Sequence, residues 1–124
     1  MASQCENSQD HAIDFPDLLN RVDHDRELMS ELFGILKEEL PGLEHTLREA
    51  VLREDMEGVR TLGHKLKGML ASVSAKRAAS AASRLEQIGT TGDKTGLRDA
   101  WLALHREVAI LLAELEARAE KMTP

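Results

Sequence analysis

Apolar residues recur every three or four positions along most of the chain, the pattern of helices that bury one face. They do so in five stretches: a short one at residues 15–22 and longer ones at 27–51, 56–73, 75–88 and 97–115. Four long helices with short connections favour an antiparallel four-helix bundle, with the short extra N-terminal helix across one end. The predicted fold class is therefore all-α.

The first two predicted helices have recognisable boundary residues. Pro16 fits the first helical position, where its missing N–H is not needed. Residues 22–25 offer N-cap candidates for the second helix, with Glu27 in its first turn. The buried stripe of this helix is expected at Leu28, Leu32, Ile35/Leu36, Leu40, Leu43, Leu47 and Val51. Because the stripe keeps its phase across Pro41, we expect one kinked helix rather than two.

The third predicted helix presents a histidine on its outer face. Asp55 can cap it, and its buried stripe is expected at Val59, Leu62, Leu66, Met69 and Val73. His64 lies two residues from both Leu62 and Leu66, so at about 100° per residue its ring points away from that stripe. Arg60, Lys67, Gly68 and Ala71 share the outward strip with His64. Glycine costs about 1 kcal/mol relative to alanine in an exposed helix. We therefore expect Gly68 to leave room for something that comes close.

The last two predicted helices follow a turn at Ser74, which is an N-cap candidate. The first of them should end at Gly89, before a loop at residues 90–96. Its inward positions are expected at Ala78, Ala81, Ala82, Leu85 and Ile88. The final helix carries a regular repeat of fours and threes at Leu97, Trp101, Leu104, Val108, Leu111 and Leu115. That repeat is typical of a bundle seam.

The stretch His64-Lys65-Leu66-Lys67-Gly68 is similar to the H-x-L-K-G signature of histidine-containing phosphotransfer (Hpt) domains. The similarity runs from about Phe15 to about Leu115. It includes the Leu-rich second helix, the acidic turn Glu54-Asp55, the turn Ser74-Ala75 and the pair Leu85-Glu86. The resemblance implies a helical bundle that carries a phosphoryl group between receiver-domain aspartates in two-component phosphorelays.

The resemblance also implies roles for three residues. His64 would be the phosphorylated nucleophile, a role that a neutral imidazole nitrogen can take near pH 7. Lys67 would stabilise charge on the phosphoryl oxygens, and Gly68 would give clearance to the partner. No carboxylate cluster is spaced to hold Mg²⁺, so the receiver would supply it and the chain needs no cofactor or metal of its own. We expect a phosphoryl carrier rather than an enzyme, with response-regulator receiver domains, including those of hybrid sensor kinases, as partners.

The chain departs from the Hpt pattern at three positions. Met69 stands where a small residue is usual, and Ser72 and Ser74 stand in a region where Asn and Gly are common. These changes leave open the side-chain hydrogen bonding near the phosphoryl group and the choice of partner. The residues do not name the cognate kinase, receiver or output pathway, nor do they separate a stand-alone protein from an excised domain.

Two other functions stay open. One is a helical adaptor that binds receiver domains without accepting phosphate. The other is the phospho-acceptor module of a chemotaxis-type kinase, which takes phosphate from a kinase domain. The remaining histidines lack the Lys-Gly context one turn on and are interpreted as ordinary surface residues; they are His11, His24, His45 and His105.

Composition limits the other functional classes. The 124 residues suffice for one domain, expected at 15–122 after a flexible N-terminal tail at 1–14. The net charge of −6 argues against binding nucleic acid. Cys5 is the only cysteine, so no intramolecular disulfide can form. No apolar run approaches the roughly 18 residues of a membrane span, and residues 1–10 do not resemble a signal peptide. We therefore expect a cytoplasmic monomer without membrane contact.

Overall fold

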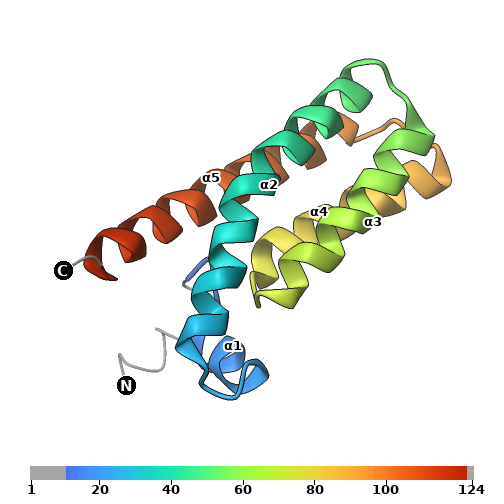
Figure 1. Cartoon of the computed structure of the whole chain (residues 1–124). Coiled ribbons are helices and arrows are strands. Elements are labelled where there is room, and N and C mark those ends of the chain that lie inside the picture. The colour runs from blue at the N-terminus through green and yellow to red at the C-terminus, as the bar shows by residue number, and fades with distance from the viewer. Residues whose placement is uncertain (1–10, 123–124) are drawn as a thin grey trace, which may run out of the picture.

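The computed structural model describes residues 11–122, and within this range the chain forms five helices and no strand. They are α1 (Phe15–Arg21), α2 (Arg26–Leu52), α3 (Met56–Ser72), α4 (Lys76–Thr91) and α5 (Leu97–Met122). Helices α2 to α5 run up and down as a bundle, and α1 is the short extra helix (Figure 1). The predicted all-α architecture is confirmed.

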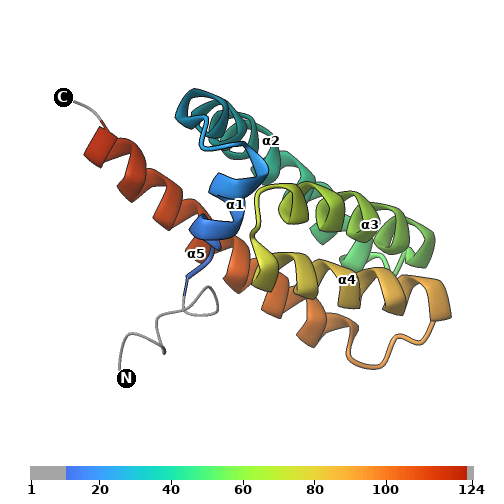
Figure 2. The same cartoon turned by 90° about the horizontal axis from the view of Figure 1, so that it is seen from below.

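The four long helices form two pairs. Helices α3 and α4 lie side by side as one pair. The second pair packs against it, with α2 in contact with α3 and α5 in contact with α4 (Figures 1 and 2). At one end α2 and α5 extend beyond the α3–α4 pair, and α1 lies beside this overhang. The ring of Phe15 packs edge-on against that of Phe33 with centroids 6.3 Å apart. The guanidinium of Arg118 lies 3.5 Å above the Phe15 ring. Helix α1 thus fills space that the two long helices leave open.

The segment ahead of α1 also belongs to the packed structure. Ala12, Ile13 and Asp14 are buried, and the Asp14 backbone N–H donates to the Ser74 carbonyl at 2.9 Å. The predicted start of the folded part at Phe15 is therefore too late. The rest of the predicted tail, residues 1–10, lies outside the described residues.

Ser74 does not cap α4 as predicted. The N-cap position is Ala75, which makes no side-chain cap bond. Ser74 is buried with a φ of 58°, and its hydroxyl donates to the Asp17 carboxylate at 2.7 Å. This hydrogen bond is the main cause that lowers the pKa of the Asp17 carboxyl below its usual value. Lys76 adds an ion pair to Asp14 at 2.9 Å. The turn between α3 and α4 therefore holds α1 in place.

Helix α2 begins and continues as the sequence indicates. The Asp25 carboxylate accepts a hydrogen bond from the Leu28 N–H at 3.1 Å and caps the helix. The helix is continuous through Pro41, which confirms one helix rather than two. Its axis changes direction part-way along its length (Figure 1).

The buried stripe in the first half of α2 differs from the prediction. Met29 and Phe33 are buried, whereas Leu28 is 40% exposed. Of the predicted alternatives Ile35/Leu36, Leu36 is buried and Ile35 is 50% exposed. Apolar residues stand next to each other in this stretch, so two stripes one residue apart are compatible with the pattern. In the observed stripe, Phe33 faces α1 and packs against Phe15.

The end of α4 also differs from the prediction. Gly89 lies inside the helix, which continues to Thr91 and ends at Gly92. Gly92 has a φ of 75°, the left-handed conformation that glycine adopts without strain, and its N–H donates to the Ile88 carbonyl. The seam of α5 is as predicted, since all six of its positions are buried: Leu97, Trp101, Leu104, Val108, Leu111 and Leu115.

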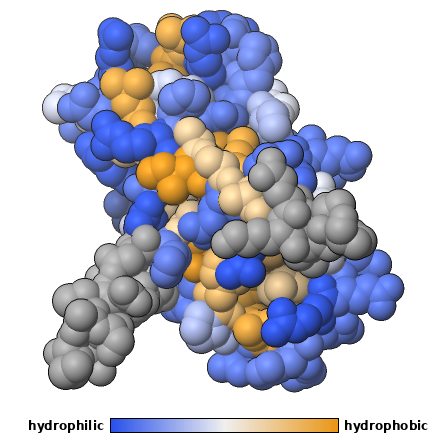
Figure 3. Space-filling model, turned by 90° about the vertical axis from the view of Figure 1, so that its left-hand side faces the viewer, coloured by the Kyte–Doolittle hydropathy of each residue, from blue (hydrophilic) through white to orange (hydrophobic). Residues whose placement is uncertain are grey.

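One end of the molecule presents a mainly polar face (Figure 3). Figure 3 shows the end at which α2 and α5 overhang, where apolar side chains form an interrupted band across an otherwise hydrophilic face. Among the helices described, none is long and apolar enough to cross a lipid bilayer.

Candidate functional site

His64 lies near the middle of α3 and faces solvent. Its side chain is 67% exposed, while Leu66 and Leu70 on the opposite face are fully buried. The helix is capped by the Asp55 carboxylate, which accepts from the Gly58 N–H at 3.1 Å. The predicted orientation of His64 is therefore confirmed. The core-facing stripe fixes which side of α3 is outward, and His64 stands on that side.

A carboxylate from the neighbouring helix holds the imidazole. Glu86 of α4 places Oε2 2.9 Å from Nδ1 of His64, and its side chain is 21% exposed. A carboxylate can only accept hydrogen bonds, so this contact requires the proton on Nδ1. The other ring nitrogen, Nε2, then keeps its lone pair. The site thus selects one tautomer of the ring, with the lone pair on the exposed Nε2 side.

Lys67 binds the same carboxylate from the other side. Its Nζ lies 2.7 Å from Oε1 of Glu86, one turn of α3 beyond His64. The pKa of the Glu86 carboxyl is lowered, chiefly by the hydrogen bond from Lys67. Burial opposes this lowering, and the hydrogen bond from His64 adds to it. Glu86 is therefore ionised at neutral pH. The sequence predicted Lys67 as a site residue but did not predict the partner that positions it.

Two glycines allow α3 and α4 to come close enough for these contacts. A Cβ atom at Gly63 would stand 2.8 Å from the backbone nitrogen of Glu86. At Gly89 it would stand 2.5 Å from the backbone nitrogen of Arg60. Neither position tolerates a side chain without movement of a helix. The backbone of α4 is thereby fixed against α3 beside the histidine.

Gly68 is a glycine of a different kind. A Cβ atom added there would meet nothing within 4 Å, so the internal packing does not require glycine. Gly68 is exposed and lies four residues beyond His64 on the outward strip. Arg60, on the same strip, pairs with Glu57 at 2.8 Å. The space above Gly68 is open, and clearance for a partner there stays a prediction.

The three residues that depart from the expected pattern, Met69, Ser72 and Ser74, make contacts within the fold. Met69 is half-buried against the core, and its carbonyl accepts from the Ser72 hydroxyl at 2.7 Å. Ser74 donates to Asp17. Both hydroxyls are thus engaged away from His64.

A shallow hollow of about 380 Å³ adjoins the site on the α4 side. It is lined by Lys67, Ser83, Glu86, Gln87, Thr90 and Thr91. All six of these residues are polar or charged types, and they include the Lys67–Glu86 ion pair. A loop of a partner protein could therefore reach the ion pair from this side.

Glu86 is a residue of the candidate site that the sequence did not predict. Its only signal in the sequence is the pair Leu85-Glu86, because 22 residues separate it from His64 and no helical spacing connects two different helices. Within residues 11–118, no group of three or more His, Cys, Asp or Glu side chains is arranged to hold a metal ion.

Comparison with protein families identifies one match. A family model described as the Hpt domain matches residues 31–118, a range that includes all of α3 and α4 and most of α2 and α5. No curated protein and no solved structure compared with this chain matches it significantly.

Proposed function

Because the chain belongs to the Hpt domain family, we propose that it carries a phosphoryl group on His64 between receiver domains. Hpt domains are histidine phosphotransfer modules of phosphorelays, and they act as carriers that interact with receiver domains rather than as catalysts. The observation that supports His64 most directly is its hydrogen bond to Glu86, which leaves Nε2 as the nucleophile in a solvent-exposed ring.

The proposed transfer follows from this geometry. The Nε2 lone pair attacks the phosphorus of a receiver's aspartyl phosphate, and the bond from phosphorus to the aspartate oxygen breaks. The aspartate leaves as a carboxylate with that electron pair. The Nδ1 proton stays on the ring, so the new phosphohistidine carries a positive imidazolium. Glu86 stabilises this charge from 2.9 Å, as a buried carboxylate does for a catalytic histidine.

Lys67 and Gly68 have supporting roles in this proposal. An ammonium group has three N–H donors, and Glu86 occupies one of them at 2.7 Å. The other two are available to equatorial phosphoryl oxygens, whose negative charge they would stabilise. Gly68 leaves space for the receiver loops that bring the aspartate and its Mg²⁺ to the ring.

A labelling experiment tests the proposal. The protein is incubated with a phosphorylated receiver and Mg²⁺, and we expect one phosphoryl group that is labile in acid and stable in base. His64→Gln should abolish labelling and keep the helical circular dichroism spectrum, since the side chain makes no core contact. His45→Gln and His105→Gln are matched controls and should be labelled like the wild type. Labelling of His64→Gln would contradict the assignment.

A second experiment isolates the role of Glu86. The ¹⁵N chemical shifts of His64 distinguish the protonated ring nitrogen from the unprotonated one. We expect Nδ1 to be the protonated nitrogen in the neutral ring of the wild type, and a mixture of tautomers in Glu86→Ala. If the neutral wild-type ring carried its proton on Nε2, the proposed role of Glu86 in keeping that nitrogen free would be wrong.

The same assay separates the two alternatives. An adaptor would bind receivers equally well as wild type and as His64→Gln, and it would never gain acid-labile phosphate. A chemotaxis-type module would be labelled by a kinase domain with ATP but not by a receiver. Either result would replace the carrier proposal.

A further inference from the structure

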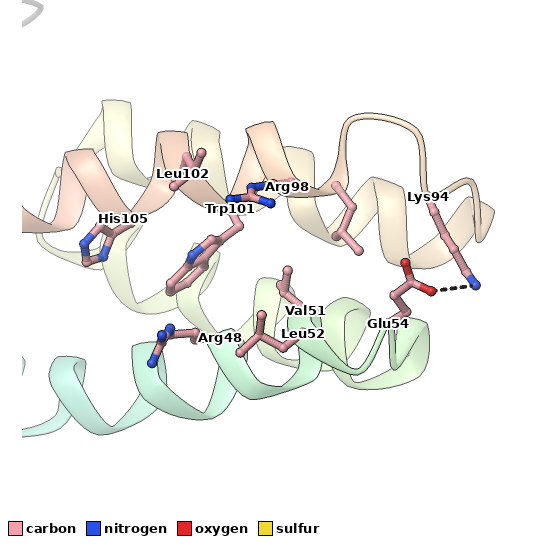
Figure 4. Close-up of a pocket in the computed structure, with 10 residues that line it drawn as sticks. Arg48, Val51, Leu52, Glu54, Lys94, Arg98, Trp101, Leu102 and His105 are labelled. Carbon is pink, nitrogen blue, oxygen red and sulfur yellow. Dashed lines mark hydrogen bonds and ion pairs between the residues drawn. The ribbon is translucent and has the colours of Figure 1, made fainter.

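Two side-chain contacts bridge from α2 and the turn after it to α5 and the loop before it, on the side of the bundle that does not carry His64. His105 of α5 lies with Nδ1 2.8 Å from Oε2 of Glu44 in α2. Lys94, in the loop before α5, lies with Nζ 3.0 Å from Oε1 of Glu54, in the turn after α2. Between these two bridges the surface is hollowed into a pocket of about 550 Å³ (Figure 4).

The two walls of the pocket repeat the same pair of residue types. Arg48 and Leu52 stand four residues apart on α2, and Arg98 and Leu102 stand four residues apart on α5. Residues at this spacing share one face of a helix. Figure 4 shows Arg48 below the Trp101 ring, and Val51 and Leu52 below Arg98. Each wall therefore contributes one guanidinium and one exposed leucine.

The bottom of the pocket is apolar. It is formed by the buried residues Val51, Leu97 and Trp101. The Trp101 ring stacks on the His105 ring with centroids 5.6 Å apart and an angle of 28° between the planes. Because His105 is held by Glu44, this stack fixes the position of the indole.

The two arginines have no carboxylate to neutralise them. Arg48 and Arg98 make no hydrogen bond or ion pair with any residue in the described part of the chain. By contrast, Arg21 and Arg60 pair with Asp17 and Glu57. Two uncompensated guanidiniums beside one pocket are notable in a protein with a net charge of −6. They make this hollow a positive site on a negative molecule.

The leucines point to a ligand with an apolar part. Leu52 is 65% and Leu102 is 45% exposed, among the largest exposures of big apolar side chains in the described residues. An apolar group between them would remove their surfaces from water at roughly 25 cal/mol per Å². A guanidinium provides a fork of N–H donors that suits a carboxylate, sulfonate or phosphate group.

We propose that this pocket binds a small organic anion with an apolar body, such as an alkyl or aryl carboxylate, sulfonate or phosphate. Leu97 and His105 are separated by about 12 Å along α5, at 1.5 Å per residue. The Lys94–Glu54 ion pair closes one end of this length, and the His105–Glu44 hydrogen bond closes the other. A pocket of this volume is in the range that small ligands occupy. A partner helix, in contrast, would have to continue past both bridges.

The test uses a pair of probes with the same ring system and different charge. The anionic probe is 8-anilinonaphthalene-1-sulfonate, and the neutral probe is N-phenyl-1-naphthylamine. Trp101 is the only tryptophan in the chain, so quenching of its fluorescence reports on this pocket directly. With the full chain we expect saturable binding of one anionic probe, with amide shifts confined to residues 44–54 and 94–105. The neutral probe should bind at least about 10-fold more weakly, since it lacks the charge-assisted hydrogen bonds.

Three variants test the arginines. Arg48→Gln and Arg98→Gln should each weaken binding of the sulfonate about 10-fold or more, and bind the neutral probe as the wild type does. Arg26→Gln is the matched control, because it removes the same charge from α2 about 33 Å from Arg48 and should change nothing. His64→Gln should bind both probes normally, so the result is independent of the phosphotransfer assignment.

Several outcomes would overturn the proposal. One is equal binding of the neutral and anionic probes, and another is unchanged affinity in both arginine variants. Amide shifts spread over other surfaces would show general adsorption instead of a site. An acidic amphipathic peptide that quenches Trp101 where the sulfonate does not would assign the groove to a protein partner. Concentration-dependent dimerisation that is lost in Leu52→Ser would assign it to a second copy of the chain.

Discussion

The backbone of Glu86 lies against Gly63, the residue that precedes His64. A Cβ atom at Gly63 would stand 2.8 Å from the Glu86 nitrogen and 3.1 Å from its Cα. The same glutamate holds the His64 ring through its carboxylate at 2.9 Å. The close contact between these two backbones therefore fixes the position of the Glu86 carboxylate relative to the His64 ring. The precision of the site depends on a residue that has no side chain.

Alanine substitutions at two glycines of α3 should have opposite effects on stability. Gly63→Ala must push α4 away and should lower the free energy of unfolding by roughly 1–3 kcal/mol. Gly68→Ala has open space and better helix propensity, so it should raise that free energy by about 0.5–1 kcal/mol. Urea unfolding monitored by circular dichroism measures both. Equal effects of the two substitutions would contradict the close approach of α3 and α4.

The Glu86 carboxyl should titrate below its usual value of 4.5. Because its pKa is lowered in the folded state, its contribution to stability is complete above the unfolded pKa and is lost as pH falls through the folded pKa. The hydrogen bonds to Lys67 and His64 should accordingly persist at pH 5 and disappear in more acidic solution. Carbon-13 NMR of the Glu86 carboxyl measures this titration.

The two partners of Glu86 should contribute unequally to its pKa. The hydrogen bond from Lys67 is the largest cause of the lowering, so Lys67→Ala should raise the Glu86 pKa more than His64→Gln does. The reverse order would show that the imidazole is the main partner of the carboxylate.

Substitutions at Lys67 and Gly68 should slow phosphotransfer for different reasons. Lys67→Ala removes a positive charge next to the ring and should slow the chemical step by on the order of 10-fold or more, with receiver binding little changed. Gly68→Gln fills the open space above α3 and should weaken receiver binding while the fold is retained. Single-turnover transfer at several receiver concentrations separates the two effects. If neither variant changes the rate or the affinity, receivers do not approach along this strip.

Trp101→Ala should be strongly destabilising. The side chain is only 9% exposed, and its removal would leave a cavity in the seam of α5 that costs on the order of 3–5 kcal/mol. Leu102→Ala, one residue further and 45% exposed, is the matched control and should cost far less. Thermal unfolding measures both. A shift of only one or two degrees for Trp101→Ala would show that the indole is not a core residue.

The sequence predicted best where one helix alone determines the answer. The repeat of α5 defines a single apolar face, and every one of its six positions is buried. The cap at Asp55 and the outward position of His64 follow in the same way from spacing within α3. In α2 the neighbouring apolar residues allowed two faces. Met29 and Phe33 are buried there in place of Leu28 and Ile35, and Phe33 packs against Phe15 of α1.

The features that the sequence did not predict involve two helices at once. Gly63 and Gly89 are ordinary glycines until α3 and α4 are packed together, when they become the points of closest approach. Glu86 is one of many surface glutamates until packing brings it within hydrogen-bonding distance of His64 and Lys67. Serine is a residue type that often caps helices, yet the Ser74 hydroxyl donates a hydrogen bond to Asp17 of α1. Spacing along a single helix carries no information about such pairs.

The position of α1 has a consequence for the order of folding. The α3–α4 contacts at the site join residues 22 positions apart, whereas the bond between Ser74 and Asp17 joins residues 57 positions apart. Closing a longer loop costs more entropy, so the hairpin of α3 and α4 should form early and α1 should dock late. Pulse-labelling hydrogen exchange during refolding should therefore protect the amides of α3 and α4 before those of Leu18 and Val22. Protection of α1 first would reverse this order, and the histidine site would then form only after α1 has docked.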